Sequence, residues 1–373
     1  MMNRTLCRTL LFWMASLLVV AAPGLASNMP LEIPEAALFP SNLSAIRISP
    51  PLDFCGERVP LEDPDIREEL EKEMILTIWN RPQFILYVKR TGRVMPHIER
   101  MLRESNMPLD LKYVAIAESA LLPTIGSSAG AVGYWQFIRE TGRRYGLRID
   151  GDIDERRNLF SSTRAAIQYF RKLHGDFGSW TLAAAAYNMG EAGMSRRIAE
   201  QGTRNYYHLW LPAETMRYVY RILAIKLILS DLPKYGFDLT REDLYEPVAF
   251  DRVQLTLSSE VPLRTVADAA GTYFKKIKDL NPEILGNRLV RGTHVILVPK
   301  GASRGFSQRF SALVAQRQAE QASRTRDVYV VKPGDSLTMI AENLGIPLSD
   351  LLQWNNLRYN SAIHPGQRLV VLR

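Results

Sequence analysis

The sequence has almost no cysteine, with only two such residues in a chain of 373. It also lacks a cluster of His, Cys, Asp and Glu at metal-ligand spacing and a glycine-rich loop of the kind that cradles phosphates. We therefore expect neither a metal ion nor another cofactor. The formal charge is +8, yet no run of Lys and Arg with interleaved aromatic residues occurs, which makes nucleic acid a poor candidate partner.

Long hydrophobic runs are also scarce, and the clearest one lies near the N-terminus, from Leu10 to Ala22. Arg4 and Arg8 come before this run and small residues come after it, which is typical of a secretory signal peptide. The run is too short to span a bilayer comfortably. The sequence therefore predicts a signal peptide at residues 1–26 and export to the periplasm, with an uncleaved membrane anchor as the open alternative.

Cleavage of this segment removes Cys7 and leaves Cys55 without an internal partner, so a structural disulfide within the mature chain is excluded. Cys55 is then either a free thiol or a link between two chains, and apart from such a link we expect a monomer. No Cys follows the apolar run at the position that a lipoprotein signal requires. Membrane association through a lipid anchor is therefore unsupported.

The region after the signal peptide divides by composition and periodicity. Residues 27–65 are rich in proline and lack helical periodicity, which predicts an extended lead-in. Across residues 66–245 apolar side chains recur at helical spacing, so we expect one compact all-α domain. Ser162 and Thr163 precede the helical stretch AAIQYFRKL and are predicted to cap its N-terminus.

The C-terminal part contains an internal repeat with an offset of 74 residues. Each copy is predicted to form a strand, two helices and a strand, which gives small α+β domains (βααβ) at residues 250–300 and 327–373. Residues 301–326 between them, rich in Gln, Arg, Ser and Ala, are predicted to be a flexible or partly helical linker. The matching residues are Ala267, Asn281 and Gly292 in the first copy and Ala341, Asn355 and Gly366 in the second.

Glu118 is the strongest candidate for chemistry. It lies in the helical stretch LKYVAIAESALLP, and at about 100° per residue its side chain shares a face with apolar neighbours, while Lys112 falls off that face. A carboxyl held against apolar groups without a cationic partner has its pKa raised, which suits a general acid. The alternative is a solvated Glu at a helix end. The apolar neighbours on the helical wheel are Leu111, Val114, Ala115 and Leu122.

The surrounding motifs add candidates for ligand binding. A run of small residues at 126–133 lets backbone approach a bulky ligand, and the YWQF that follows offers aromatic faces for sugar rings and an amide for an acetamido group. Two later motifs, AAYNMG and ETMRYV, hold further polar groups. For each residue the alternative is ordinary packing between helices. The candidates are Tyr134, Gln136, Tyr187, Asn188 and Tyr218.

Taken together and in this order, the motifs from about Val88 to Leu229 resemble the lytic transglycosylase domain of membrane-bound lytic murein transglycosylases of the D type. The resemblance implies a mainly α protein with a lysozyme-like all-α catalytic domain. It also implies that Glu118 serves as both acid and base, that Tyr218 positions its carboxyl, and that Ser119 supports it. The residues implied to contact substrate are Gln136, Tyr187 and Asn188.

The implied reaction begins when Glu118 protonates the oxygen that leaves from the bond between N-acetylmuramic acid and N-acetylglucosamine. The carboxylate then takes the proton of the muramic 6-hydroxyl, which closes onto C1 and gives a 1,6-anhydro product. Neither water nor a second carboxylate is needed, whereas ordinary glycosidases use two carboxylates. Two alternatives stay open, namely a muramidase that hydrolyses the same bond and an inactive peptidoglycan-binding scaffold.

The carboxylates of GDIDERRN bear on the first alternative. If Asp152, Asp154 or Glu155 faced Glu118, hydrolysis with a second carboxylate would be possible. In the family resembled this stretch is structural, and we expect the two adjacent arginines, 156 and 157, to pair with these carboxylates instead.

The last copy of the repeat, with PGDSL and the Trp-Asn pair at 354–355, resembles a LysM module over about Val328 to Leu372. The resemblance implies binding of the N-acetylglucosamine-containing glycan strands of peptidoglycan. The first copy has Ser259–Leu263 in place of PGDSL, so we expect a degenerate LysM-like domain that acts as a spacer. The residues implied to bind glycan are Gly334, Asp335, Ser336, Leu337 and Asn355.

Overall fold

The computed structural model describes residues 47–323 and 326–372. The predicted signal peptide at 1–26 and the first part of the lead-in lie outside the described residues. What remains of the lead-in folds against the helices as a short antiparallel hairpin of β1 (Asp53–Phe54) and β2 (Glu57–Arg58). Phe54 and Leu61 are buried in the main hydrophobic core, so this end of the predicted lead-in is part of the domain.

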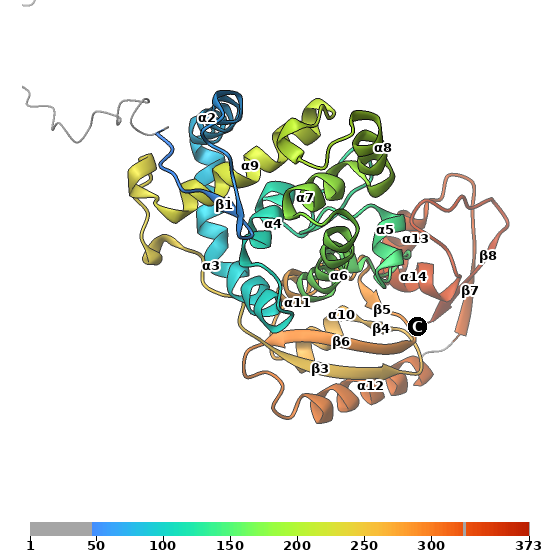
Figure 1. Ribbon diagram of the computed structural model, residues 1–373. Coiled ribbons are helices and arrows are strands. Elements are labelled where there is room, and N and C mark those ends of the chain that lie inside the picture. The colour runs from blue at the N-terminus through green and yellow to red at the C-terminus, as the bar shows by residue number, and fades with distance from the viewer. Residues whose placement is uncertain (1–46, 324–325, 373) are drawn as a thin grey trace, which may run out of the picture.

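The predicted all-α domain is confirmed as a bundle of eight helices within the described residues (Figure 1). Helix α9, which begins with the ETMRYV motif, packs against α2, α4 and α7, and α6 packs against α7. The helices are α2 (Pro64–Trp79), α3 (Arg81–Glu104), α4 (Lys112–Ser119), α5 (Arg139–Arg144), α6 (Leu159–Phe177), α7 (Trp180–Met189), α8 (Glu191–Gln201) and α9 (Ala213–Ser230).

The expected cap of α6 is wrong. The helix begins at Leu159, and Asn158 caps it by accepting hydrogen bonds from the amides of Phe160 (3.0 Å) and Ser161 (2.9 Å). Ser162 and Thr163 lie inside the first turns and donate their hydroxyls to backbone carbonyls four residues earlier. An Asn at the start of the apolar periodicity was the better N-cap signal.

Two small units with the predicted βααβ order follow the helical domain. In the first, β3 (Phe250–Leu257) pairs antiparallel with β6 (Gly292–Pro299), and in the second β7 (Arg326–Val330) pairs antiparallel with β8 (Arg368–Leu372). The first unit adds a short pair, β4 (Val261–Pro262) with β5 (Arg288–Leu289). The helices are α10 (Leu263–Ala269) and α11 (Phe274–Leu280) in the first unit, and α13 (Leu337–Leu344) and α14 (Leu348–Trp354) in the second.

The repeated Asn of the two units has the same structural role in both. Asn281 donates its amide to the carbonyls of Ile277 and Leu297 and accepts from the Leu297 amide, each at 2.8 Å. Asn355 makes the equivalent bonds to Leu351 and Val370, at 2.6–2.9 Å. One side chain thus ties the second helix to the last strand, which explains the Asn in both copies.

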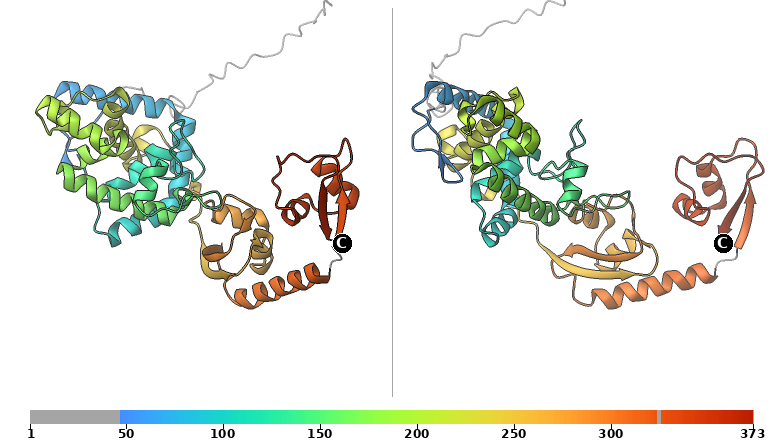
Figure 2. Two further views of the ribbon diagram at one scale, coloured as in Figure 1. Left: turned by 90° about the vertical axis from the view of Figure 1, so that its right-hand side faces the viewer. Right: turned by 45° about the vertical axis from the view of Figure 1, so that its right-hand side comes forward.

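The predicted linker at 301–326 is largely a helix, α12 (Phe306–Ser323), which runs from the first unit toward the second (Figure 2). Phe306 and Phe310 are buried in the core of the first unit, and α12 packs against α10. The flexible alternative is therefore wrong for this stretch, because two aromatic side chains one helical turn apart anchor the helix to the first unit.

The first unit is docked onto the helical domain by backbone hydrogen bonds. The amide of Asp154 donates to the Glu283 carbonyl, and the amide of Leu285 donates to the Asp152 carbonyl, both at 2.8 Å. Ile153 and Ile284 form a β-bridge between the same two segments. The GDIDERRN stretch therefore serves as the joint between the catalytic domain and the first unit.

Candidate active site

Glu118 lies in the last turn of α4, where it accepts a short hydrogen bond from the hydroxyl of Tyr218 on α9. The helix ends at Ser119 because Ala120 and Leu121 both adopt left-handed backbone, with φ of 54° and 60°. Leu122 therefore lies beyond the helix and does not share its face, which corrects one neighbour predicted from the helical wheel. Glu118 is half-buried, and its carboxyl is held where α4 packs against α9.

The electrostatic surroundings of Glu118 match those of a general acid. Burial raises the pKa of its carboxyl to about 7, although the hydrogen bond from Tyr218 and the charge of Arg221 act in the opposite direction. The charge of Glu214 raises this pKa further. At neutral pH a large share of the Glu118 carboxyl groups is therefore protonated and able to donate a proton.

A pair of polar contacts at opposite ends holds α4 and α9 together. Tyr218 meets Glu118 at one end, and at the other Lys226 Nζ lies 2.7 Å from Oδ2 of Asp110, in the 3-10 turn just before α4. Asp110 lies eight residues before Glu118, and Lys226 lies eight residues after Tyr218, so the two segments run antiparallel. The Asp110–Lys226 ion pair was not predicted, and only the antiparallel packing of the helices reveals it.

Tyr187 is brought next to Glu118 from α7. Its hydroxyl donates to the carbonyl of Trp135 at 2.6 Å, and its ring stacks on Phe170 with centroids 4.6 Å apart. Burial raises the pKa of Tyr187, and the charge of Glu118 adds to this shift, so the two groups are neighbours. Tyr187 thus lies between Glu118 on α4 and the YWQF segment, to which its hydroxyl is bonded.

Asn188, the next residue on α7, faces the first turns of α9. Its Oδ1 accepts a hydrogen bond from the hydroxyl of Thr215 at 2.8 Å. Thr215 was not predicted, although it lies within the ETMRYV motif three residues before Tyr218. The bond fixes the orientation of the Asn188 amide, with Nδ2 as its remaining polar group.

Ser119 supports the site from inside the protein. It is only 3% exposed, and its hydroxyl contacts the carbonyls of Ala115 at 3.1 Å and Tyr134 at 2.8 Å. This geometry fits the predicted supporting role. It leaves no room for direct contact between Ser119 and a substrate.

Gln136 closes the turn that precedes it. The backbone of Gln136 is left-handed, with φ of 46°. Its side-chain amide donates to the carbonyls of Ile125 at 3.0 Å and Gly133 at 2.9 Å. Gly133 itself has φ of 86°, and a Cβ there would lie 1.9 Å from the carbonyl oxygen of Arg156. At this position the small residue serves close backbone packing, and the Oε1 of Gln136 remains for a ligand.

The structure does not place Tyr134 in the site. Its side chain is 9% exposed and lines a small pocket between the catalytic domain and the first unit, together with Leu280 and Pro282. The charge of Glu283 contributes to the raised pKa of Tyr134, which also shows that the ring faces the joint. Predicting Tyr134 as a sugar contact was wrong, because YWQF lies in an irregular turn whose residues point in different directions.

The acidic residues of GDIDERRN stay away from Glu118. Asp154 forms a buried ion pair with Arg156 at 2.7 Å and lies 4.0 Å from Arg157, while Glu155 accepts from the Arg148 amide at 2.7 Å. The carboxylate that does act on Glu118 is Glu214, which pairs with Arg221 at 2.5 Å. The expected pairing with the two arginines is therefore confirmed for Asp154, whereas Glu155 bonds to Arg148 instead.

The described residues contain no group of three or more His, Cys, Asp and Glu side chains that could hold a metal ion. Cys55 is half-buried, and burial raises the pKa of its thiol, which makes it a poor nucleophile. A link between two chains through Cys55 stays a prediction.

Two regions of the sequence match known protein families. The sequence model of the Transglycosylase SLT domain matches residues 95–210, and that of the LysM domain matches residues 329–372. Membrane-bound lytic murein transglycosylase D of Escherichia coli K12 is 35% identical over 332 residues, which cover 85% of this chain and 72% of the relative. The chain belongs to this family.

More distant relatives share parts of this lytic transglycosylase. The peptidoglycan transglycosylase gp16 of Escherichia phage T7 is 41% identical over 83 residues, or 22% of this chain and 6% of the phage protein. Among solved structures, the 70 kDa soluble lytic transglycosylase of Escherichia coli is 15% identical, with a TM-score of 0.33, and covers 54% of this chain and 41% of that one. The assignment of this chain to its family therefore depends on the sequence matches alone.

The LysM domain of this transglycosylase builds its PGDSL segment as a turn followed by a helix cap. Asp335 Oδ2 accepts from the Tyr329 hydroxyl and the Lys332 amide, both at 2.8 Å. Ser336 caps α13 through the Met339 amide. Gly334, with φ of 88°, allows the turn and is exposed.

Two of the residues predicted to bind glycan have structural roles instead. Leu337 is 6% exposed and belongs to the core of the LysM domain. Asn355 commits its amide to α14 and β8, as described above. Within the predicted set, Gly334 and Ser336 present exposed surface at this loop.

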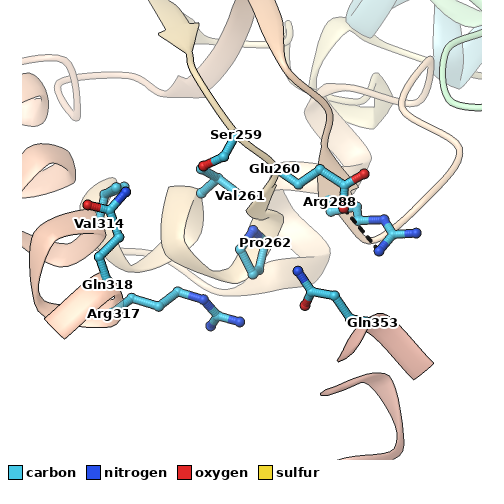
Figure 3. Close-up of a pocket in the computed structure, with 9 residues that line it drawn as sticks. All are labelled: Ser259, Glu260, Val261, Pro262, Arg288, Val314, Arg317, Gln318 and Gln353. Atoms are coloured by element: carbon cyan, nitrogen blue, oxygen red, sulfur yellow. Dashed lines mark ion pairs between the residues drawn. The ribbon is translucent and has the colours of Figure 1, made fainter. Parts of the chain in front are cut away.

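In the first unit the loop that replaces PGDSL is partly covered. A pocket of about 300 Å³ is lined by this loop, residues 259–262, by side chains of α12 and by Gln353 of α14. Figure 3 shows these side chains around it. Arg288 and Glu260 form an ion pair across one side of it, at 3.1 Å. Because α12 covers this face, the structure favours the predicted spacer role for the first unit.

Proposed function

We propose that this lytic transglycosylase cleaves the β-1,4 bond between N-acetylmuramic acid and N-acetylglucosamine in peptidoglycan, with Glu118 as the single acid and base. The observation that carries the proposal is the Glu118 carboxyl itself, whose pKa is raised to about 7 and whose Oε1 is held by Tyr218. With Oε1 held, Oε2 is the atom that donates the proton to the leaving oxygen.

After donation, the same carboxylate takes the proton of the muramic 6-hydroxyl as that oxygen attacks C1. The C1–O bond to the leaving sugar breaks, the bond from O6 to C1 forms, and the proton returns to Glu118, so the enzyme ends as it began. The hydrogen bond from Tyr218 stabilises the carboxylate between the two steps, because a charged acceptor strengthens it. Gln136 and Asn188 are proposed to bind the acetamido groups through their remaining amide atoms.

Hydrolysis is the second candidate because Glu214 acts on Glu118 electrostatically and is 63% exposed at its side chain. A water molecule activated by Glu214 would give a reducing sugar in place of the anhydro ring. The Glu214 carboxylate is already engaged by the Arg221 guanidinium at 2.5 Å, which favours the intramolecular attack over activation of a water molecule.

Mass spectrometry of the fragments released from purified sacculi separates these reactions. The proposal expects fragments lighter by one water than hydrolytic products, and none from the Glu118→Gln variant. Hydrated ends would support hydrolysis, and a complete absence of products from the unmodified protein would support a scaffold.

The LysM domain is proposed to hold the glycan strands through the loop around Gly334 and Ser336, which keeps the catalytic domain close to its polymer. We also propose that the protein works in the periplasm, given the predicted signal peptide and a relative described as membrane-bound. Within the described residues, no helix is long and apolar enough to cross a membrane. Fractionation of cells that produce the tagged protein tests the location.

A further inference from the structure

One pocket of the catalytic domain lies on the opposite side of α9 from Glu118. It measures about 420 Å³ and is formed by the start of α2, the start of α9 and the segment 206–210. At about 100° per residue, Met216 and Tyr220 in its wall point about 160° away from Tyr218 around α9. The occupant of this pocket is therefore not the sugar that Glu118 acts on.

Four large aromatic side chains form part of the wall of this pocket. Tyr206, Tyr207 and Tyr220 contribute rings, and the indole of Trp210 stands at 75% exposure. The buried hydroxyl of Tyr207 has no hydrogen-bond partner within the described part of the chain. Aromatic faces with few fixed polar groups are the usual lining of a site for an amphipathic ligand such as a sugar.

The exposed Trp210 is held in place by its backbone. Its amide donates to Oε1 of Gln201 at 2.7 Å, and its carbonyl accepts from Nε2 of the same side chain at 2.9 Å. The Tyr206 hydroxyl donates to the Met216 carbonyl at 2.6 Å and ties the segment to α9. A large exposed aromatic side chain on a fixed backbone loses little entropy when a ligand stacks on it.

The pocket carries no excess positive charge. Lys72 pairs with Glu69 at 3.1 Å and Arg217 pairs with buried Glu73 at 2.5 Å, while Asp65 adds a further carboxylate to the lining. No positive charge is left over to attract a phosphate, a nucleic acid or an anionic peptide. An uncharged ligand with many hydroxyl groups fits such a lining best.

We propose that this pocket is a second glycan-binding site, which takes an uncharged N-acetylglucosamine residue of a β-1,4-linked glycan strand with Trp210 as its stacking platform. The inference rests on the proposed action of this chain on peptidoglycan, which brings such a polymer to its surface. A site on the far side of α9 binds a separate stretch of glycan from the one being cut, and it adds to the hold of the LysM domain.

Hydrogen–deuterium exchange of the full chain carrying Glu118→Gln tests the proposal, with the N-acetylglucosamine hexamer as the probe. We expect the probe to slow exchange over residues 206–213 and, independently, in the LysM domain. Trp210→Ala should weaken protection over 206–213 by at least about tenfold in probe concentration and leave LysM protection unchanged. Trp79→Ala is the matched control, since Trp79 is 82% exposed on α2 but does not line the pocket.

Two results would overturn the proposal while leaving the proposed reaction intact. One is protection of the LysM domain without protection over 206–213 at saturating probe. The other is protection over 206–213 that needs no probe and vanishes when residues 27–46 are deleted, which would assign the pocket to the chain's own N-terminal segment. Failure of the proposed function itself is read separately, from the fragments released from sacculi.

Discussion

Two glutamates of this protein, Glu118 and Glu283, have carboxyl pKa values raised to about the same level but lie in different surroundings. Burial raises the pKa of Glu118 and that of Glu283 to about 7 in each case. Glu118 is half-buried and accepts a hydrogen bond from Tyr218, whereas Glu283 is 7% exposed in the joint between two domains, with its Oε2 unpartnered. A raised pKa alone therefore does not identify the catalytic acid, and access to a ligand decides between them.

The largest expected effect separates the two carboxyls by activity. Glu118→Gln should lower turnover on sacculi by on the order of 10³-fold or more, because the only proton donor to the leaving oxygen is lost. Glu283→Gln should leave turnover within about threefold, because this side chain faces the joint. Release of soluble fragments measures both variants, and equal losses would end the distinction between the two sites.

Tyr218→Phe sharpens the comparison because it removes the hydrogen bond that distinguishes the Glu118 carboxyl from that of Glu283. Loss of a hydrogen bond to a charged carboxylate should cost about 1.5–3 kcal/mol, or a turnover loss of about 10–100-fold. This bond lowers the pKa of Glu118, so its removal should move the limb of the pH–rate profile assigned to Glu118 toward higher pH. An unchanged profile would show that Tyr218 packs beside Glu118 without controlling its acidity.

The two copies of the small unit allow a matched test of the repeated Asn. Asn281→Ala should lower the free energy of unfolding of the first unit by about 3 kcal/mol, because fully buried amide and carbonyl groups lose their partners. Asn355→Ala, in a half-buried setting, should cost about 2 kcal/mol in the LysM domain. Exchange rates of amides in β6 and β8 report each unit separately, and a larger cost at Asn355 would contradict the ranking by burial.

The last prediction concerns the pH dependence of stability. Glu283 has a folded-state pKa raised to about 7 from an ordinary 4.5, so its contribution to stability is fully present below pH 4.5 and is lost as the pH rises through 7. Glu283→Gln should remove this loss and make the joint more stable at pH 8, by at most about 3 kcal/mol. Urea unfolding at pH 5 and pH 8 measures the difference, and parallel behaviour of both proteins would show that Glu283 ionises freely.

Sequence reasoning succeeded where regular periodicity fixes direction. The apolar face of α4 placed Glu118 among buried neighbours, and the spacing of the repeat predicted two βααβ units. It failed where direction depends on tertiary contacts. Tyr134 lies in a turn that points its ring into the joint. Helix α12 is anchored at its start by buried Phe306 and Phe310, with Leu313 and Val314 packing beside them, and such a short apolar patch is hard to recognise in a mostly polar stretch.

The contacts that complete the site are long-range in sequence. Tyr218 is 100 residues from Glu118, and Thr215 is 27 residues from Asn188. Resemblance to a family predicted the first of these bonds, and only the packing of α7 against α9 revealed the second. The joint through Ile153 and Ile284 joins residues that neither composition nor periodicity relates.

The most direct test of this account is the titration of the Glu118 carboxyl by ¹³C NMR, with glutamate labelled at Cδ and the signal assigned by its absence in Glu118→Gln. The account predicts a pKa near 7, in line with the burial of the side chain. A pKa near the ordinary value of 4.5 would contradict it, because the carboxyl would then be ionised at neutral pH and unable to protonate the leaving oxygen.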